Sequence, residues 1–384
     1  MLDNIAVVGI HETTVGKLPG RSAIELQAEA GVAAVADAGL ARQDVDAIFS
    51  FSGYSQSMLM QGARVAEYIG LRPSVTMQID VGGPGTHHSA LMAASAAIEA
   101  GLCTTALCTF GENGISIRRG GRGRAPGTLT GGEDFEKPYG LIAVISQYAL
   151  LAERYMHLYG VTSEDLGAVA VSQRYHASLN PNAQKRTPIT LAEHQASPYV
   201  STPLRMLDCS LISDGAGAFV VTSKDRACDL PRQAVEVLGW GTATTHHIVS
   251  AAPDIPDLGA VPAAQDAYRR AGLTVEDVDV VYVHDACTVS TLIGIEALGL
   301  CAIGQGGSYA SEGRLELGNP RPVNLHGGML SHGHAGGIFH FLDALRQLRG
   351  EAGPRQVAAA EVAAVSGNGN VFSTYSTMLL GRSR

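Results

Sequence analysis

The chain has 384 residues, of which 46% are hydrophobic and 16% are charged, and it carries a formal net charge of −9 at pH 7. This length can form two core-bearing units or one large fused domain, and this composition excludes a disordered or fibrous protein. The negative charge argues against nucleic acid as the main partner, because phosphate binding requires a basic surface.

The N-terminus and the cysteines narrow the class of protein further. No apolar stretch is long enough to span a bilayer, and the first residues, MLDNIAVVGI, carry Asp3 and lead directly into a strand pattern, which argues against a signal peptide. The six cysteines show no C-x-x-C spacing, so neither a zinc site nor a disulfide framework is expected. We therefore expect a cytoplasmic protein without a metal.

The first hundred residues alternate between strand and helix patterns, which indicates parallel pairing through right-handed crossovers. The predicted elements are, in order, a strand over 5–10, a helix over 22–39, strands over 44–52 and 74–83, a helix over 89–101 and a strand over 105–110.

The helix predicted over 89–101 carries only one charged residue, Glu99, and has small side chains on every face. A helix that is apolar all round must be buried on all sides. In an α/β protein such a helix lies between two sheets, so we predict a layered α-β-α-β-α architecture.

The alternation stops between residues 111 and 208, where an Arg-rich run, a predicted helix over 141–160 and a polar segment over 180–200 follow one another. We interpret this region as an insertion over the mouth of a site. A strand predicted over 213–223 closes the first half, which we place at 1–232.

The second half, 233–384, returns to alternating patterns. Its predicted elements are a strand near 234–243, a helix over 263–272, a strand over 278–285, a helix over 290–300, a helix over 335–349 and strands over 361–367 and 372–380.

Two stretches of the first half recur in the second. The phrase AGLARQDVDAIFSFSG at 38–53 returns as AGLTVEDVDVVYVHDA at 271–286, an offset of 233 (Asp44 to Asp277). IDVGG at 79–83 returns as NLHGG at 324–328, an offset of 245 (Gly82 to Gly327). Two repeats at similar offsets predict an internal duplication. The second copy of the longer phrase gains His284 and Asp285.

The segment SHGHAGG holds His332 and His334 between glycines, before a predicted helix. Glycines let a ligand approach the backbone, and a helix N-terminus favours negative charge. A neutral imidazole there can take a proton or donate to a developing oxyanion. The alternative is a pair of structural histidines that cap the turn.

His284 and Asp285 end a predicted strand, and sites in parallel sheets form beyond the carboxyl ends of strands. His284 could orient an acyl oxygen while Asp285 fixes its tautomer, or Asp285 could simply cap the next helix. Cys287 could be a nucleophile, although such a residue more often fills a core.

Two glycine-rich segments complete the candidates. VSGNGN at 365–370 predicts a turn whose backbone N–H groups at Gly367, Asn368 and Gly369 could form an oxyanion hole, or a plain Asn-Gly hairpin. VGGPGTHH at 81–88 precedes the buried helix in a setting suited to a nucleophile, yet it offers only Thr86, His87 and His88. We count the two histidines as candidate substrate-binding residues.

Taken together, these motifs resemble the thiolase superfamily, and within it the sterol-carrier-protein-x or lipid-transfer type. The resemblance covers almost the whole chain and rests on long motifs, which are MLDCSLISDGAGAFVVTS, HDACTVSTLIGIEALGLC followed by GQGG, VNLHGGMLSHGHAGG and ALRQLRGEAG. It implies the duplicated five-layered α-β-α-β-α fold and a homodimer or dimer-based assembly. It also explains the repeated phrase, because that fold consists of two copies of one unit.

The resemblance assigns roles to two of the motifs. The histidine of the family's G-H-P motif falls on His334, with Ala335 in place of the proline. The N-E-A-F or H-D-C-F motif, which lines an oxyanion hole, falls on His284, Asp285, Ala286 and Cys287.

Two family cysteines are missing at the corresponding positions. The nucleophilic cysteine falls on Pro84, and the second cysteine, an acid/base in a C-x-G motif, falls on Ser366. A thiolytic thiolase needs a thiolate to hold the acyl group, and a serine is a far weaker acid/base than a cysteine. We therefore do not expect thiolysis of acetoacetyl-CoA.

The expected activity is carbon–carbon bond making or breaking on an acyl-CoA, with retro-aldol cleavage of a β-hydroxyacyl-CoA favoured and the thioester as substrate rather than a cofactor. His334 and His284 would act as acid/base and oxyanion groups, with Ser366 as a third catalytic candidate. The first alternative is an acyltransferase whose nucleophile has moved to Cys287 or Ser366 or comes from a partner. The second is a non-catalytic subunit that binds acyl-CoA.

The resemblance also suggests partners. Similar aldolases of steroid side-chain degradation work with a small OB-fold, zinc-ribbon subunit that helps bind the CoA substrate, and they carry tyrosines at the two histidine positions. The Arg-rich run could hold the CoA phosphates or form a solvated loop face. Its arginines are Arg118, Arg119, Arg122 and Arg124.

Overall fold

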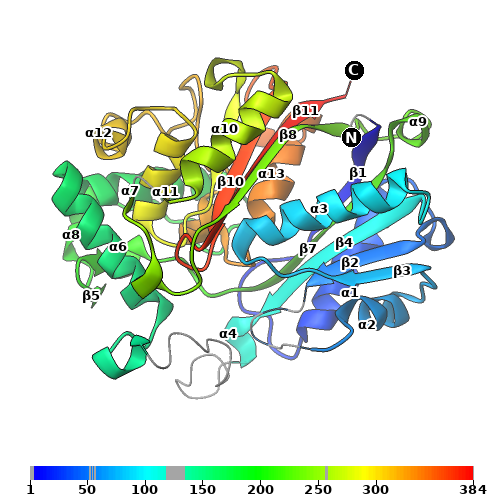
Figure 1. Cartoon of the computed structure of the whole chain (residues 1–384), viewed down its shortest axis with the longest axis horizontal. Coiled ribbons are helices and arrows are strands. Elements are labelled where there is room, and N and C mark those ends of the chain that lie inside the picture. The colour runs from blue at the N-terminus through cyan, green and yellow to red at the C-terminus, as the bar shows by residue number, and fades with distance from the viewer. Residues whose placement is uncertain are drawn as a thin grey trace.

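The computed structural model describes residues 4–51, 53, 55, 58–117, 135–255 and 258–383 (Figure 1). Within these ranges, nine strands form the main sheet in the order β3-β2-β4-β7-β1-β8-β11-β10-β9. Their bounds are Ile5–Glu12 (β1), Ala47–Phe51 (β2), Val75–Gln78 (β3), Thr105–Asn113 (β4), Asp214–Ser223 (β7), Val235–Thr244 (β8), Val280–Val283 (β9), Val362–Gly369 (β10) and Thr374–Arg382 (β11).

Helices pack on the outer faces of this sheet and between its two halves. The α-helices of the described ranges are Ala23–Asp37 (α1), Gln61–Ile69 (α2), Gly83–Glu99 (α3), Gly114–Ile117 (α4), Val144–Tyr159 (α6), Ser163–Ser178 (α7), Leu191–Ala196 (α8), Lys224–Ala227 (α9), Ala260–Ala271 (α10), Thr288–Ala297 (α11), Gly306–Ser311 (α12) and Ile338–Arg349 (α13). A π-helical turn, η7, spans Gly328–His332.

The two halves of the chain repeat one strand arrangement. In the first, β1 pairs antiparallel with β7, β7 antiparallel with β4, and β4 parallel with β2. In the second, β8 pairs antiparallel with β11, β11 antiparallel with β10, and β10 parallel with β9. The predicted duplication is confirmed, and the predicted boundary at residue 232 falls between α9 and β8. The parallel pairing predicted for the first hundred residues holds for β2 with β3 and β4, whereas β1 pairs antiparallel with β7 and β8.

The halves stack as five layers, although β1 and β8 join their sheets through two residue pairs. Helices α1 and α2 cover the outer face of the first sheet, and α10 and α11 cover that of the second. Helices α3 and α13 contact strands of both sheets and therefore form the central layer (Figure 1). The predicted α-β-α-β-α architecture is confirmed.

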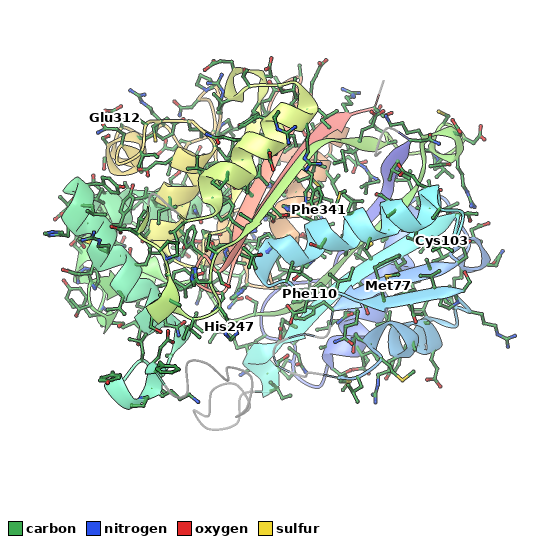
Figure 2. The ribbon with its side chains drawn as sticks, in the orientation of Figure 1. Met77, Cys103, Phe110, His247, Glu312 and Phe341 are labelled. Atoms are coloured by element: carbon green, nitrogen blue, oxygen red, sulfur yellow. The ribbon has the colours of Figure 1, made fainter. Side chains whose placement is uncertain are left out.

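Alternation along the strands explains the layers. Ile5 and Val7 of β1 point into the central core, whereas Ala6 and Val8 point to the outer core beneath α1. Successive side chains of a strand face opposite sides, so a strand that is apolar throughout is buried on both faces. Phe110 and Phe341, labelled in Figure 2, bring β4 and α13 into the central core.

The central helix α3 begins earlier than the sequence predicted. It starts at Gly83 rather than near 89, with Gly82 at the N-cap at φ 80° and Pro84 in the first turn. Proline is favourable there because the first helical N–H groups have no partner within the helix. His87 and His88 are therefore helical residues and not part of a loop.

The region 111–208 contains more regular structure than expected. The predicted helix over 141–160 is α6, but α7 was missed, although Thr162 and Asp165 form a capping box at its start. The polar segment contains α8 and leads into a two-stranded sheet of Tyr199–Ser201 and Leu204–Arg205. None of the helices in the described ranges is long and apolar enough to cross a membrane.

Candidate active site

The candidate site lies where β9 and β10 end beside the start of α3. These strands are parallel neighbours, so His284, just after β9, lies next to Gly367 near the end of β10. A Cβ atom added to Gly367 would lie 2.4 Å from Cβ of His284 and 2.7 Å from Cγ of Pro84. One added to Gly337 would lie 2.5 Å from Cγ of Pro84. Glycine is thus required at both positions, because any side chain would push the backbones apart.

His284 is buried and neutral at physiological pH. Burial lowers its pKa to about 3, and the neighbouring His340 and His334 act in the same direction. Its Nδ1 lies 3.0 Å from Oδ1 of Asn368. Tyr148, on α6, completes this contact by accepting a hydrogen bond from Nδ2 of Asn368 at 2.6 Å.

His334 lies between η7 and α13 and is held by the irregular segment that precedes β7. Its backbone N–H donates to Oγ of Ser213 at 2.9 Å. Burial lowers the pKa of the ring to about 4, while the Asp285 carboxylate and a hydrogen bond to the Leu211 backbone act in the opposite direction. Both histidines at this site are therefore unprotonated imidazoles that can accept a proton or a hydrogen bond.

Asp285 has neither of the two predicted roles. Its carboxylate accepts hydrogen bonds from the backbone N–H groups of Met329 at 2.9 Å and Leu330 at 3.1 Å, and Nε2 of His340 lies 2.8 Å away. It therefore holds η7 and His340 rather than the ring of His284. The next helix is not capped by it either, because α11 begins after Cys287.

The turn predicted over 365–370 is wrong, because β10 continues through Gly369 and pairs with β11. Asn368 pairs with Tyr375 and Gly369 with Thr374, so the backbone groups proposed for an oxyanion hole belong to a strand. Pairing with β11 overrides the local Asn-Gly turn preference.

The structure does not bring Ser366 to the candidate site. Since Gly367 faces His284 and Pro84, its neighbour Ser366 points to the opposite face of the sheet. There its hydroxyl lies 3.2 Å from the hydroxyl of Tyr375, within the outer core beneath α11. Gly367 is therefore the residue of β10 that faces Pro84.

Cys287 also lies outside this group. It is a buried core residue at the start of α11, and its backbone forms an isolated β-bridge with that of Cys209. Burial and a hydrogen bond with Cys209 raise the pKa of its thiol well above the usual value. A thiol that stays protonated is a poor nucleophile.

The two helical histidines are buried beside the candidate site. Nε2 of His87 donates to the carbonyl of Gly336 at 3.0 Å, which ties the segment after His334 to α3. Nδ1 of His88 lies 2.8 Å from Oγ of Ser376 on β11. Burial lowers the pKa of His87 to about 4 and that of His88 to about 3, so neither carries charge at neutral pH.

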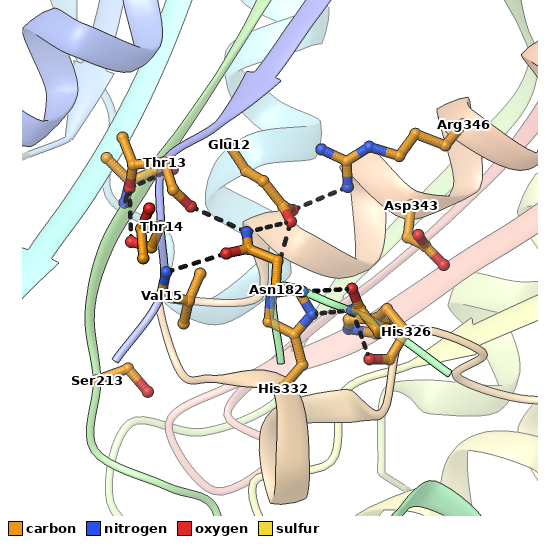
Figure 3. Close-up of polar contacts among 12 residues, drawn as sticks. Glu12, Thr13, Thr14, Val15, Asn182, Ser213, His326, His332, Asp343 and Arg346 are labelled. Atoms are coloured by element: carbon orange, nitrogen blue, oxygen red, sulfur yellow. Dashed lines mark hydrogen bonds and ion pairs between the residues drawn. The ribbon is translucent and has the colours of Figure 1, made fainter. Parts of the chain in front are cut away.

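His332 has different partners from His334 and belongs to a buried network of hydrogen bonds and ion pairs (Figure 3). Its Nδ1 accepts from Nδ2 of Asn180 at 2.7 Å, and its Nε2 lies 3.7 Å from the Glu12 carboxylate, which pairs with Arg346 at 2.9 Å. The rings of His332, His326, His340 and His284 follow one another, with centroids 5.3, 4.5 and 6.4 Å apart. Behind His284 the interior is therefore lined by a row of buried imidazole rings.

A pocket of about 460 Å³ lies beside α6, about one helical turn from Tyr148. Its lining is mostly apolar and includes Leu141, Leu150, Leu151, Val249 and Ile255. The four arginines predicted to hold CoA phosphates lie outside the described residues. Within the described ranges, no group of three or more His, Cys, Asp or Glu side chains is placed to hold a metal ion.

Comparison with known proteins identifies the family of this chain. Residues 241–382 match the family model described as thiolase C-terminal domain-like. The chain is 34% identical to the steroid side-chain-cleaving aldolase of Thermomonospora curvata over 380 residues, which covers 95% of each chain. The chain belongs to the thiolase superfamily.

Two further matches define the branch of the superfamily. The 17-hydroxy-3-oxo-4-pregnene-20-carboxyl-CoA lyase of Mycobacterium tuberculosis is 34% identical over 95% of this chain and 96% of its own length. The solved Ltp2-ChsH2(DUF35) aldolase superposes with a TM-score of 0.87 at 32% identity, covering 99% of this chain and 98% of that one. The predicted membership of the sterol-carrier-protein or lipid-transfer type is confirmed.

Some residues of the site were not found from the sequence. Tyr148 lies far away along the chain in a region interpreted as an insertion, and no motif pointed to it. Asn368 was considered only for its backbone N–H, whereas its side chain contacts His284. His340 contacts Asp285 but follows His334 by six positions, outside the glycine-rich segment SHGHAGG.

Proposed function

We propose that this thiolase-superfamily chain cleaves a β-hydroxyacyl-CoA by a non-covalent retro-aldol reaction and needs no cofactor beyond the thioester substrate. The observation that carries the proposal is that Pro84 and His284 meet at Gly367, while Gly337, three positions after His334, also packs against Pro84, and that both histidines are neutral. Proline has no group that can hold an acyl chain covalently, whereas neutral imidazoles can move protons. The names of the two similar relatives, an aldolase and a CoA lyase, support it.

The reaction balances without any other reactant. An imidazole accepts the proton of the β-hydroxyl group while the bond between Cα and Cβ breaks, so that Cβ becomes a ketone or aldehyde carbon. The electron pair of that bond passes to Cα and forms the enolate of a shorter acyl-CoA. An imidazolium then returns one proton to Cα, so the net proton count is unchanged. Hydrogen-bond donors near the thioester oxygen stabilise the enolate.

Two alternatives lose support at the same site. Relocation of the nucleophile to Cys287 conflicts with the raised pKa of its buried thiol. Relocation to Ser366 conflicts with its position on the other face of β10. A chain that only binds acyl-CoA would have no use for the two histidines as proton carriers.

The test is turnover of a panel of β-hydroxyacyl-CoA esters, followed by mass spectrometry of the shortened acyl-CoA and the carbonyl product. We expect cleavage by the wild-type protein, a loss of about 10²-fold or more in kcat for His284→Ala and for His334→Ala, and no effect of His157→Ala, an exposed histidine on α6. Cleavage that survives both site variants, or a stable acyl adduct on Cys287 or Ser366, would overturn the proposal.

We further propose that the working form is a homodimer built on β3. This strand is the edge of the sheet in the described structure and pairs only with β2 (Figure 1). It carries no charged residue, and Met77 is 42% exposed (Figure 2). Edge strands are normally protected by charge or bulges, so an uncharged open edge indicates a pairing surface.

We also propose that a small acyl-CoA-binding subunit of the OB-fold, zinc-ribbon type joins this chain. Support comes from the similar solved aldolase, whose name includes a second component, ChsH2(DUF35). Co-expression with such a subunit followed by size-exclusion chromatography tests this. Failure of the two to co-elute, together with full activity of the chain alone, would contradict it.

A further inference from the structure

The ring of His284 is held by a chain of hydrogen bonds that reaches from β9 across β10 to α6. Nδ1 of His284 lies 3.0 Å from Oδ1 of Asn368. Nδ2 of Asn368 donates to Oη of Tyr148 at 2.6 Å and to the carbonyl of Asn370 at 3.0 Å. The Tyr148 hydroxyl donates to the same carbonyl at 2.5 Å. His284, Asn368 and Tyr148 are all buried, so water does not compete for these bonds.

The partners of Asn368 fix the direction of its amide. Its NH₂ group has two hydrogens, and two acceptors, Oη of Tyr148 and the carbonyl of Asn370, lie on that side. A flipped amide would place its carbonyl oxygen against the carbonyl of Asn370, which cannot donate. Oδ1 of Asn368 must therefore face His284.

This direction decides the tautomer of His284. A carbonyl oxygen only accepts hydrogen bonds, so Nδ1 of His284 must carry the hydrogen. A neutral imidazole has one ring N–H, and burial keeps this ring neutral. The lone pair is therefore on Nε2, whereas the hydrogen bond of the ring within the described part of the chain is made by Nδ1.

We propose that Asn368 and Tyr148 are positioning residues that keep His284 in the Nδ1–H tautomer, so that Nε2 is the atom that accepts the β-hydroxyl proton. The last step rests on the retro-aldol function proposed above, whereas the tautomer is a property of the resting protein. The family resemblance placed His284 in an oxyanion-hole motif, where the ring would have to donate. The hydrogen-bond chain makes it an acceptor instead.

Tyr148 gives the region 111–208 a part in the chemistry. It is the link of the chain that comes from α6, whereas His284 and Asn368 lie at the ends of two strands of the second half. If α6 moves away, Asn368 keeps the Asn370 carbonyl but loses the other acceptor that fixes its amide, so the tautomer of His284 is held less firmly. The Nδ1–H tautomer is therefore most fully populated when α6 is docked against the hairpin at Asn370.

The tautomer can be measured directly by NMR of protein labelled with ¹⁵N in histidine, with the His284 signals assigned by their loss in His284→Gln. In the resting wild-type protein at pH 7.5 we expect a protonated Nδ1 and an unprotonated Nε2. Asn368→Asp should keep this tautomer, because a carboxylate also only accepts. Asn368→Leu should shift the population toward Nε2–H, and Tyr148→Phe should do so partially. A wild-type signal with a protonated Nε2, or no change in Asn368→Leu, would overturn the proposal.

Kinetics then test the catalytic step. We expect Asn368→Leu to lose about 10²-fold in kcat, with a smaller loss for Tyr148→Phe and no loss for the exposed control Tyr175→Phe. Asn368→Asp should retain turnover and move the acid limb of the pH profile to higher pH, because a carboxylate stabilises the imidazolium. Turnover that is independent of the tautomer would remove Nε2 as the base and overturn the proposal. Loss of turnover in His334→Ala alone, with His284 dispensable, would instead contradict the role of His284 and leave the measured tautomer standing.

Discussion

At the residue scale, Pro84 decides which thiolase-superfamily chemistry this chain can perform. It stands in the first turn of α3, in contact distance of positions 337 and 367 and near His284. A thiol at the same place would lie at the N-terminus of a long helix, and such a position lowers the pKa of a thiol. The surroundings of the missing nucleophile are thus still present.

We therefore expect Pro84→Cys to form a covalent acyl adduct with acetyl-CoA, whereas the wild-type protein forms none. Cysteine is smaller than proline, so the close approach of Gly337 and Gly367 is preserved. Intact-protein mass spectrometry, followed by peptide mapping to position 84, measures the adduct, and Pro84→Ala serves as the matched control. An unmodified Pro84→Cys protein with a normal thermal unfolding midpoint would show that the site no longer supports acyl transfer.

The sequence predicted the location of the site better than the side of the sheet to which each side chain points. His284 and His334 were found from their glycine settings and strand ends, which are local features. Ser366 was given the place that Gly367 occupies, because a shift of one residue in a strand moves a side chain to the opposite face. Asn368 and Tyr148 could not be paired from the sequence, since 220 positions separate them and only the packing of α6 brings them together.

At the element scale, the two halves use glycine in the same way where a strand meets its outer helix. A Cβ on Gly9 of β1 would lie 2.2 Å from the carbonyl oxygen of Ala34 on α1, and one on Gly239 of β8 would lie 2.2 Å from that of Ala267 on α10. Both helices therefore pack directly on the strand backbone. The two alanines are 233 positions apart, the offset of the repeated phrase.

We expect Gly9→Ala and Gly239→Ala each to lower the free energy of unfolding by about 1–3 kcal/mol, because the added methyl group must push a helix away from its sheet. Gly62→Ala is the matched control, since its Cβ would meet no atom closer than 3.4 Å. Urea unfolding followed by circular dichroism measures the three values. Equal stability of all three variants would contradict direct helix-on-strand packing.

Elements with a strong pattern were predicted and those decided by partners were not. The small and apolar residues on every face of α3 are enough to predict that this helix lies in the central layer. The end of β10 was misjudged because Asn-Gly favours a turn locally, whereas eight residue pairs with β11 extend the strand. Helix α7 has caps but almost no apolar periodicity, because it is buried on several sides by α8, α11 and α12.

At the scale of the whole molecule, the buried histidines make stability depend on pH. The pKa values of His87, His176 and His334 are lowered to about 4 and those of His88 and His284 to about 3, in each case mainly by burial. In the unfolded chain these groups titrate near 6.5. Below pH 6.5 the unfolded state therefore binds more protons than the native state, and stability falls until the pH approaches the native pKa values.

We expect the free energy of unfolding to be nearly constant between about pH 7 and pH 8 and to fall steeply toward pH 5, by up to about 1.4 kcal/mol per pH unit for each buried histidine. His88→Gln should reduce this slope by the contribution of one histidine, whereas the exposed His157→Gln should leave the slope unchanged. Urea unfolding at pH 7.5, 6.5 and 5.5 measures the slope. A second loss should begin below about pH 4.5, where Glu12, whose pKa is about 2 beside Arg346, begins to be protonated in the unfolded chain. An unchanged slope in His88→Gln would show that this ring is protonated in the native state.

The open edge of the sheet at β3 is a property of the whole molecule, because it depends on the order of all the strands. Along the described sheet, β9 at the other end has further cover, because Val281 forms a parallel bridge with Val323, whereas β3 presents Thr76, Met77 and Gln78 to solvent. Met92, Ala93 and Ala96 of α3 lie partly or fully exposed as well. Two copies related by a two-fold axis would pair β3 with β3 and bury these residues together.

We expect Met77→Lys to convert a wild-type dimer into a monomer at micromolar concentration, because a lysine on an edge strand opposes sheet pairing and would have to be buried. Ile303→Lys replaces another exposed apolar residue, remote from β3 in the second half of the chain, and should leave the dimer intact. Sedimentation velocity on the three proteins gives the mass of each species. A wild-type monomer, or a Met77→Lys dimer, would show that β3 is not the subunit contact. If the monomer also keeps full retro-aldol turnover, the site is complete within one chain, as the hydrogen bonds from Tyr148 to His284 imply.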